Sequence, residues 1–201
     1  MKEASIWVDQ YYGGLIGHGA FVRTLCSNNF QHKTVSWKIP GNSYFKRENL
    51  PLSCCEFEEN QTMFHLFSLG EAAWGAFHKE HSLDELSFKP NLAGMIVIID
   101  RQSVVRKFEE EQNNVNNSSF IRSIGGIHFS WFEKQGLPFV IAAAGYQEFT
   151  SDVENLRDFL GVSSEVPIIL GPPLWQESPL QFDFTHATQV MIALHQTLNV
   201  A

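Results

Sequence analysis

The sequence predicts an α/β fold in which a mostly parallel sheet lies between two layers of helices. The first observation is three runs that are apolar on both faces, as buried parallel strands are, at residues 95–99, 139–144 and 166–170. The second is the alternation of strand-like and helix-length segments in the second half of the chain, which favours right-handed crossovers. The third is an antiparallel pair, residues 50–58 and 62–69, joined by a short polar turn.

Two helices in the second half have clear ends. Residues 151–154 read Ser-Asp-Val-Glu, a capping box that satisfies free backbone donors, and Gly161 is the expected stop. The last helix should have Asp183 or Thr185 as its N-cap and should present one apolar stripe to the sheet. The stripe consists of Phe184, Ala187, Val190, Met191, Leu194 and Leu198.

A third helix is expected over residues 120–134. Gly125 and Gly126 would each cost it about 1 kcal/mol relative to alanine. Its buried side would carry Ile121, Ile124, Ile127, His128 and Trp131.

Length and charge limit the classes of function. A chain of 201 residues with 44% hydrophobic content favours a single domain over residues 1–201. A net charge of -8, with 14 Lys and Arg against 22 Asp and Glu, disfavours nucleic acid as a partner. The adjacent Cys54 and Cys55, in an odd set of three cysteines, argue against a disulfide framework. Without a transmembrane run or a secretory signal pattern, we expect a cytoplasmic protein.

Several local features carry a family resemblance. Tyr11-Tyr12-Gly13 opens a glycine-rich turn, Leu50-Pro51-Leu52 enters the second strand, and Gly94 precedes an apolar strand that ends in Asp100. With the order of the elements, they resemble the small Ras-like GTPase superfamily, and within it the bacterial MglA-type gliding-motility and polarity GTPases. The resemblance covers nearly the whole chain. It implies a three-layer α/β/α G-domain fold, with a mostly parallel six-stranded sheet and one antiparallel strand.

The glycine-rich turn lacks the residues that would hold a nucleotide. A phosphate-binding loop reads Gly-x-x-x-x-Gly-Lys-Ser/Thr, so that backbone donors, a lysine and a hydroxyl act on the phosphates and magnesium. The turn here offers Gly13, Gly14 and Gly17, but the lysine position is His18 and the hydroxyl position is Gly19. A mostly neutral imidazole and a residue without a side chain replace the two functional groups. We therefore expect a degenerate loop, with no cofactor and no metal.

The other three nucleotide motifs of the resembled family are also replaced. Phe67 stands where the aspartate of Asp-x-x-Gly would reach magnesium, and Glu71 follows Gly70. Residues 144–147 stand for the guanine-reading motif, where Tyr146 is the one ring that could stack on a base. Residues 171–173, Gly-Pro-Pro, lack backbone donors at both prolines. The resemblance therefore predicts a catalytically dead pseudo-GTPase with no catalytic residue.

Two segments are candidate contact surfaces for a protein partner. Trp74 and Phe77 lie in the region that matches switch II of the resembled family. Leu174, Trp175 and Phe182 belong to a proline-stiffened loop, which binds at low entropic cost. The resemblance implies an adaptor or structural subunit that binds an active GTPase paralogue, a roadblock-type protein or another assembly protein.

Two alternative functions stay open from the sequence. One is an unconventional nucleotide-binding switch that uses the residual glycine loop with His18 and Tyr146. The other is an enzyme of another class. It would use Cys54 or Cys55 with His65 as a thiol nucleophile, or the His78/His81 pair, whose spacing also suits a solvated helix end.

One feature of the first strand does not fit a central position. Asp9 and Gln10 interrupt its apolar run, whereas a central parallel strand should be apolar on both faces. Either the strand is displaced, or these two side chains fill the empty cleft.

Overall fold

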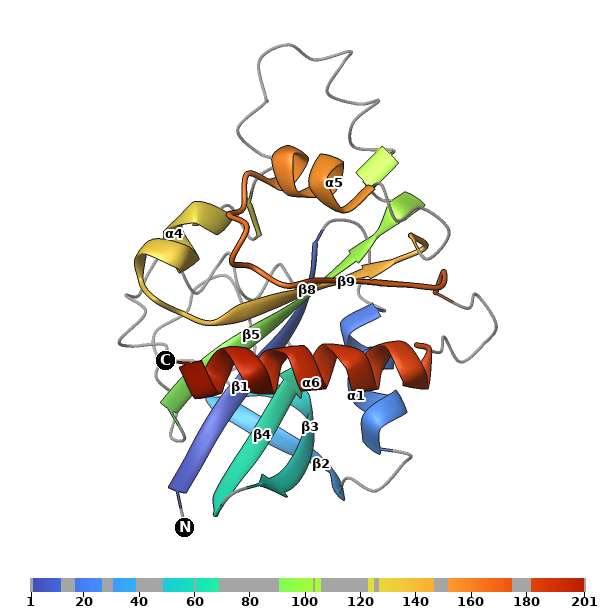
Figure 1. Ribbon diagram of the computed structural model, residues 1–201. Helices are drawn as coiled ribbons and strands as arrows, with labels where there is room; N and C mark the ends of the chain where they lie inside the picture. Colours follow the sequence, from blue (N-terminus) through green and yellow to red (C-terminus); the bar gives the residue numbers. More distant parts are fainter. Residues whose placement is uncertain are drawn as a thin grey trace.

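A single twisted sheet forms the centre of the structure, a computed structural model (Figure 1). The structure describes residues 2–11, 17–26, 31–38, 49–59, 61–68, 91–102, 104–105, 123–124, 127–146, 152–174 and 182–200. Seven of the described strands form the sheet, in the order β2-β3-β4-β1-β5-β8-β9. Their bounds are β1 (Lys2–Tyr11), β2 (Gln31–Lys38), β3 (Asn49–Glu59), β4 (Thr62–Ser68), β5 (Asn91–Asp100), β8 (Phe139–Ala144) and β9 (Ile168–Gly171).

The directions of the strands confirm the predicted fold class. Strand β1 pairs in parallel with β4 and β5, and β8 pairs in parallel with β5 and β9. Strand β3 pairs antiparallel with both β4 and β2, so within the seven-stranded sheet it alone runs against the others. The predicted number of six strands is wrong, because β2 adds a seventh at the edge beyond β3.

The first strand lies at the centre of the sheet and is not displaced. Ile6, Trp7 and Val8 are buried, which accounts for this position between β4 and β5. Asp9 and Gln10 continue the ladder, opposite Val97 and Ile98 of β5. The alternative that their side chains fill the cleft concerns atoms outside the described part of the structure.

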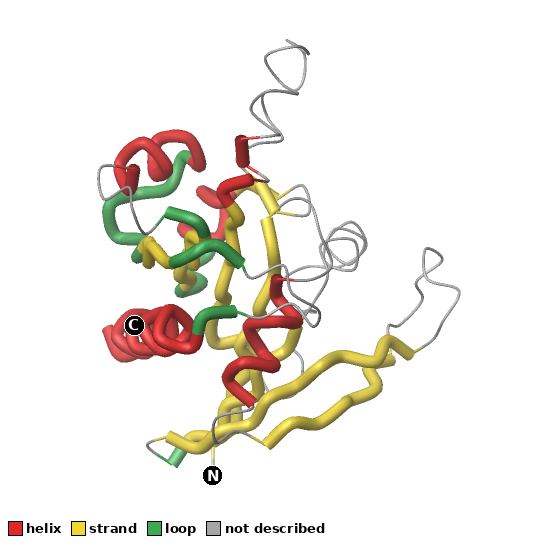
Figure 2. The backbone as a smooth tube through the Cα atoms, turned by 90° about the vertical axis from the view of Figure 1, so that its right-hand side faces the viewer, coloured by secondary structure: helices red, strands yellow, loops and turns green. Residues whose placement is uncertain are grey.

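Helices α1 (Gly17–Cys26) and α6 (Phe184–Val200) cover one face of the sheet. Figure 1 shows α6 crossing the sheet with α1 beside it, and Figure 2 views α6 along its axis. Alternate residues of the central strands, such as Ile96 and Ile98, point to this face and are buried under Phe21 and Leu194. This contact forms the main apolar core.

Helix α4 (Phe129–Lys134) packs against the opposite face of the sheet. The rings of Phe129 and Phe132 lie 6.0 and 6.1 Å from the ring of Phe139. Phe139 precedes Val140, a member of the core under α6, and successive side chains of a strand point to opposite faces. The sheet therefore has helices on both sides, as the three-layer prediction requires.

The predicted stop of α5 (Asp152–Leu160) is confirmed. Gly161 adopts φ +67°, and the amides of Gly161 and Val162 donate to the Arg157 carbonyl at 2.9 and 3.2 Å. Only glycine adopts this left-handed conformation without a steric cost, so the chain turns here. Ser151, the expected cap, lies outside the described residues.

The last helix follows its predicted pattern with one exception. The Asp183 carboxylate accepts the backbone N–H of His186 at 2.7 Å, so Asp183 and not Thr185 caps α6. Ala187, Val190 and Leu194 are buried as expected. Phe184 is 44% exposed, and His186 takes the buried place at the start of the stripe. None of the helices in the described ranges is long and apolar enough to cross a membrane.

The helix expected over residues 120–134 is wrong in its first half. Two short strands, β6 (Ser123–Ile124) and β7 (Ile127–His128), form an antiparallel pair here, and α4 begins only at Phe129. The two residues between these strands are glycines, which favour a two-residue hairpin turn and disfavour a helix. Turn chemistry therefore outweighs the helical spacing of the isoleucines.

Candidate functional site

The carboxyl ends of four parallel strands define the candidate site. In the strand register, Tyr11, Asp100, Ala144 and Gly171 end β1, β5, β8 and β9 at the same edge of the sheet. Open α/β sheets bind ligands in the crevice outside this edge. This edge of the sheet is therefore the candidate site.

Phosphate-binding loops connect a strand to the N-terminus of a helix, and residues 11–17 have this arrangement. Strand β1 ends at Tyr11 and α1 begins at Gly17, so a short segment joins a central strand to a helix N-terminus. Gly13 and Gly14 lie in this segment, outside the described residues. His18 and Gly19 occupy the first turn of α1, at the positions of the lysine and hydroxyl of a phosphate loop. The first turn supplies backbone donors but neither the fixed cation nor the metal ligand.

The segment that matches the guanine-reading motif is bound to the neighbouring strand. The amides of Gly145 and Tyr146 both donate to the Gly171 carbonyl, at 2.9 and 3.0 Å. Gly145 adopts φ +84°, and a Cβ at this position would lie 3.2 Å from Cβ of Arg101. The Tyr146 side chain is only 5% exposed, so its ring is held inside the protein and is not offered to a base.

A buried histidine connects β9 to α6 beneath this edge. His186 Nε2 lies 2.9 Å from the Ile169 carbonyl oxygen, and since a carbonyl only accepts, Nε2 carries the proton. The imidazole stacks on Phe182 with ring centres 4.9 Å apart. Its Nδ1 has no hydrogen-bond partner among the described residues. Burial lowers the pKa of His186, and the Ile169 hydrogen bond and the Asp183 charge offset this effect only in part.

His186 was not among the predicted site residues. The signal was present in the sequence, because His186 precedes Val190 by four residues and so falls on the buried stripe of the last helix. A polar residue on such a stripe indicates a buried hydrogen bond. The uncharged form fits this position, because a charged imidazole would lose its hydration there.

The proline-stiffened loop folds back onto its own sheet at both described ends. Phe182 is 3% exposed, and its ring meets that of Phe21 edge-on, with centres 5.0 Å apart. The Thr24 hydroxyl donates to the Phe182 carbonyl at 3.1 Å and lies 3.3 Å from the Phe182 amide, from which it can accept. Leu174 is half-buried and contacts the main core. The expectation that Phe182 presents its ring to a partner is therefore wrong in this chain, because the ring fills the space between α1 and α6.

The remaining candidate residues fall mostly outside the described part. Trp74, Phe77, Trp175 and the His78/His81 pair lie there. Among the described residues, no three His, Cys, Asp or Glu side chains are close enough to hold a metal ion.

The proposed pairing of a cysteine with His65 gains no support. In the β3–β4 register His65 stands opposite Glu56, and its Nδ1 lies 3.2 Å from the Glu56 carboxylate. Cys54 and Cys55 stand opposite Phe67 and Leu66 in the same register. The contact that the structure gives for His65 is thus with the Glu56 carboxylate, and the side chains of Cys54 and Cys55 lie outside the described part.

Comparison with known proteins gives similarity in fold alone. Neither a family model nor a curated protein matches the sequence. Among solved structures, the cytosolic domain of the FeoB iron transporter of T. maritima in a GDP form is 11% identical, with a TM-score of 0.47 over 98% of this chain and 63% of that chain. The G domain of the same transporter is 11% identical, with a TM-score of 0.46 over 97% of this chain and 98% of that chain.

A third similar structure is the putative nucleolar GTP-binding protein 1 of Plasmodium falciparum. It is 11% identical, with a TM-score of 0.46 over 99% of this chain and 87% of that chain. The chain thus spans about two thirds of the FeoB cytosolic domain and most of the other two structures. The strand order itself is that of the predicted G-domain-like fold: α1 follows the central β1 directly, and β3, the one antiparallel strand of the seven-stranded sheet, lies between β2 and β4.

Proposed function

We propose that this chain is a non-catalytic pseudo-GTPase of the MglA-related kind that acts as a structural or adaptor subunit in a cytoplasmic protein assembly. The observation that carries the proposal is the place of His18 and Gly19 in the first turn of α1. A phosphate loop at this position needs a lysine charge and a hydroxyl ligand for magnesium. The chain therefore retains the scaffold of a nucleotide site without its two functional side chains.

The opposite end of the same edge supports this proposal. A guanine base would be read beyond the end of β8, where the amides of Gly145 and Tyr146 are already bonded to Gly171. The Tyr146 ring is buried, which removes the stacking surface of the alternative nucleotide-binding function. Binding a base there would require breaking these internal contacts.

The proposed mechanism of the adaptor is recognition by shape, without a nucleotide-dependent change of state. Trp74 and Phe77 are the proposed anchors, because aromatic side chains dominate the binding energy of protein interfaces. Trp175 is a further proposed anchor, whereas Leu174 and Phe182 contribute to the core of this chain. The proposed partner is an active GTPase paralogue or a roadblock-type protein.

Purification of the tagged chain from its native source tests the adaptor function. We expect a complex of defined stoichiometry in size-exclusion chromatography, with the partner identified by mass spectrometry. Trp74→Ala and Phe77→Ala should release the partner without unfolding the chain. Phe184→Ala is the matched control, because this aromatic of α6 is exposed and is not one of the proposed anchors. A chain that elutes only as a free monomer would contradict the proposal.

A further inference from the structure

A cavity opens at the edge of the sheet opposite to the candidate nucleotide edge. Its volume is about 580 Å³, within the range of roughly 300 to 1,000 Å³ that small-molecule sites occupy. The end of α4, the loop before β9 and the last turns of α6 form its walls. Leu137, Phe139 and Val166 give it an apolar part. It is separate from the strand ends that the proposed function concerns.

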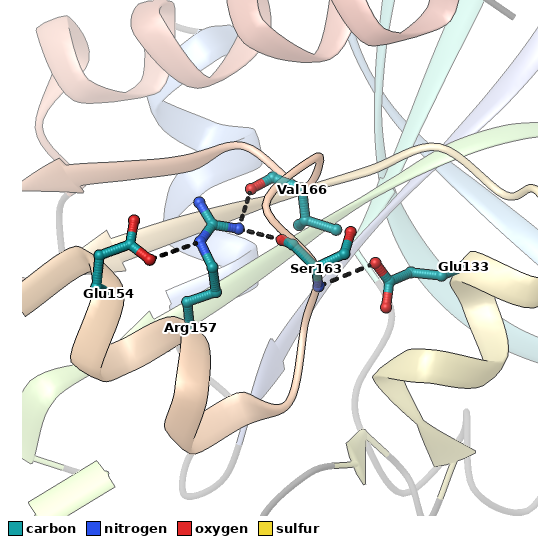
Figure 3. Close-up of polar contacts among 5 residues, drawn as sticks. All are labelled: Glu133, Glu154, Arg157, Ser163 and Val166. Carbon is teal, nitrogen blue, oxygen red and sulfur yellow. Dashed lines mark hydrogen bonds and ion pairs between the residues drawn. The ribbon is translucent and has the colours of Figure 1, made fainter.

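Hydrogen bonds hold the loop wall of this cavity in place (Figure 3). Arg157 Nη1 donates to the carbonyl oxygen of Ser163, and to that of Val166 at 2.9 Å. The Ser163 amide donates to Glu133 Oε1 at 3.1 Å, which ties the loop to α4. Glu154 lies 3.7 Å from Arg157 Nε on the side of α5. Because the wall is fixed by the protein itself, a ligand need not order it on binding.

The charges of the cavity favour a cation. Glu133 and Glu165 line it, and none of its lining residues in the described part of the chain is a lysine or arginine. The guanidinium of Arg157, which bonds the loop wall, pairs with Glu154. The C-terminal part of α6 supplies Gln196 and Thr197; its last turn contains no basic residue, and a helix C-terminus carries partial negative charge. The amide oxygen of Gln196 is a further acceptor for an N–H donor. Negative charge beside an apolar wall matches a positively charged group on a hydrocarbon chain.

We propose that this cavity binds a small protonated aliphatic amine. The ammonium group pairs with the carboxylates of Glu133 and Glu165, and the alkyl chain covers Leu137 and Val166. Glu133 uses one carboxylate oxygen for the Ser163 amide, which leaves the other for the ligand. The site lies at the opposite edge of the sheet from the candidate nucleotide site.

Three probes that share one hydrocarbon chain test the charge requirement. Hexylamine, hexanol and hexanoate are titrated into isotope-labelled protein, and the amide NMR shifts of Gly136, Ser163 and Thr197 are followed. We expect hexylamine to bind about a hundredfold more tightly than hexanol, since the ammonium group makes two charged hydrogen bonds and each is worth about a factor of ten in affinity. Hexanoate should not bind, and added salt should weaken the amine alone. Equal binding of the three probes, or no shifts with the amine, would overturn the proposal.

Charge-neutral variants locate the ammonium group. Glu165→Gln and Glu133→Gln should each weaken hexylamine about tenfold and leave hexanol unchanged. Glutamine at position 133 keeps an acceptor for the Ser163 amide, so the wall is preserved. Glu58→Gln, an exposed change on β3, is the matched control and should leave all three affinities unaltered. An amine affinity that Glu58→Gln lowers as much as Glu165→Gln would show non-specific charge attraction and refute the site.

Discussion

Replacing Gly171 by alanine should remove much of the stability of the contact between β9 and α6. A Cβ on Gly171 would lie 2.0 Å from His186 Nδ1 and 2.3 Å from its Cγ, whereas ordinary contacts of this kind are about 3.5 Å or longer. His186 is 2% exposed, so its ring cannot turn toward solvent without opening the packing around it. It must therefore leave the Ile169 carbonyl and its stacking position on Phe182.

The expected cost follows from these two effects. Overpacking a core costs about 1 to 3 kcal/mol, and a lost buried hydrogen bond adds about 1 kcal/mol, so we expect a total of about 2 to 4 kcal/mol. Urea denaturation followed by tryptophan fluorescence measures the loss. Gly136→Ala is the control, since its Cβ would meet nothing within 4 Å and only its φ of +65° opposes the change.

A double-mutant cycle separates the steric contact from other effects of the alanine. His186→Ala removes the ring, so in that background Gly171→Ala should cost less than about 1 kcal/mol, a coupling of about 2 kcal/mol. Gly136→Ala should cost the same in both backgrounds. If Gly171→Ala is equally destabilising with and without the imidazole, the proposed contact does not hold β9 to α6.

Three further predictions concern the same region. Burial lowers the pKa of His186 in the folded protein, so the unfolded chain binds the proton more readily. The free energy of unfolding should therefore have its full value above about pH 6.5 and decrease as the pH drops toward the pKa of the folded state. In His186→Gln this decrease should be smaller. Thr24→Val should cost about 1 to 2 kcal/mol in urea denaturation, because the hydroxyl bonds Phe182 twice. Asp183→Ala should cost about 1 kcal/mol in thermal unfolding through the lost helix cap, and Asp183→Asn much less.

Each of these predictions has an outcome that contradicts it. A pH dependence that is identical in His186→Gln would assign the effect to other histidines. Thr24→Ser keeps the hydroxyl and should retain most of the stability; an equal loss in Thr24→Ser and Thr24→Val would point to the methyl group instead. An Asp183→Asn variant as unstable as Asp183→Ala would exclude the cap.

The sequence predicted the central strands because they carry a signal of their own. Residues 95–99 and 139–144 are apolar on both faces, and this pattern places a strand inside a parallel sheet without any tertiary information. Strand β2 has no such signal: Gln31–Lys38 mixes charged and apolar residues, as an edge strand can, and only the pairing with β3 defines it. The helix expected from residue 120 was also mispredicted. The isoleucines have helical spacing, but Gly125 and Gly126 favour a turn between two short strands.

In the candidate site, too, the sequence predicts some features and not others. The positions of Gly17, His18 and Gly19 after the first strand follow from the order of the elements, and the structure places them at the start of α1. The burial of Tyr146 and Phe182 depends on contacts with residues far apart in the sequence, such as Gly171 and Phe21. An aromatic side chain in a loop gives no sign of whether it faces a partner or its own core.

Equilibrium titration with a fluorescent guanine nucleotide in the presence of Mg²⁺ tests the pseudo-GTPase proposal most directly. Since His18 and Gly19 supply neither the charge nor the metal ligand, we expect no saturable binding, with any dissociation constant above about 1 mM. The same preparation, denatured and analysed for released nucleotide, should contain none. Saturable binding that requires Mg²⁺, at a stoichiometry of one nucleotide per chain, would contradict the loss of the nucleotide site.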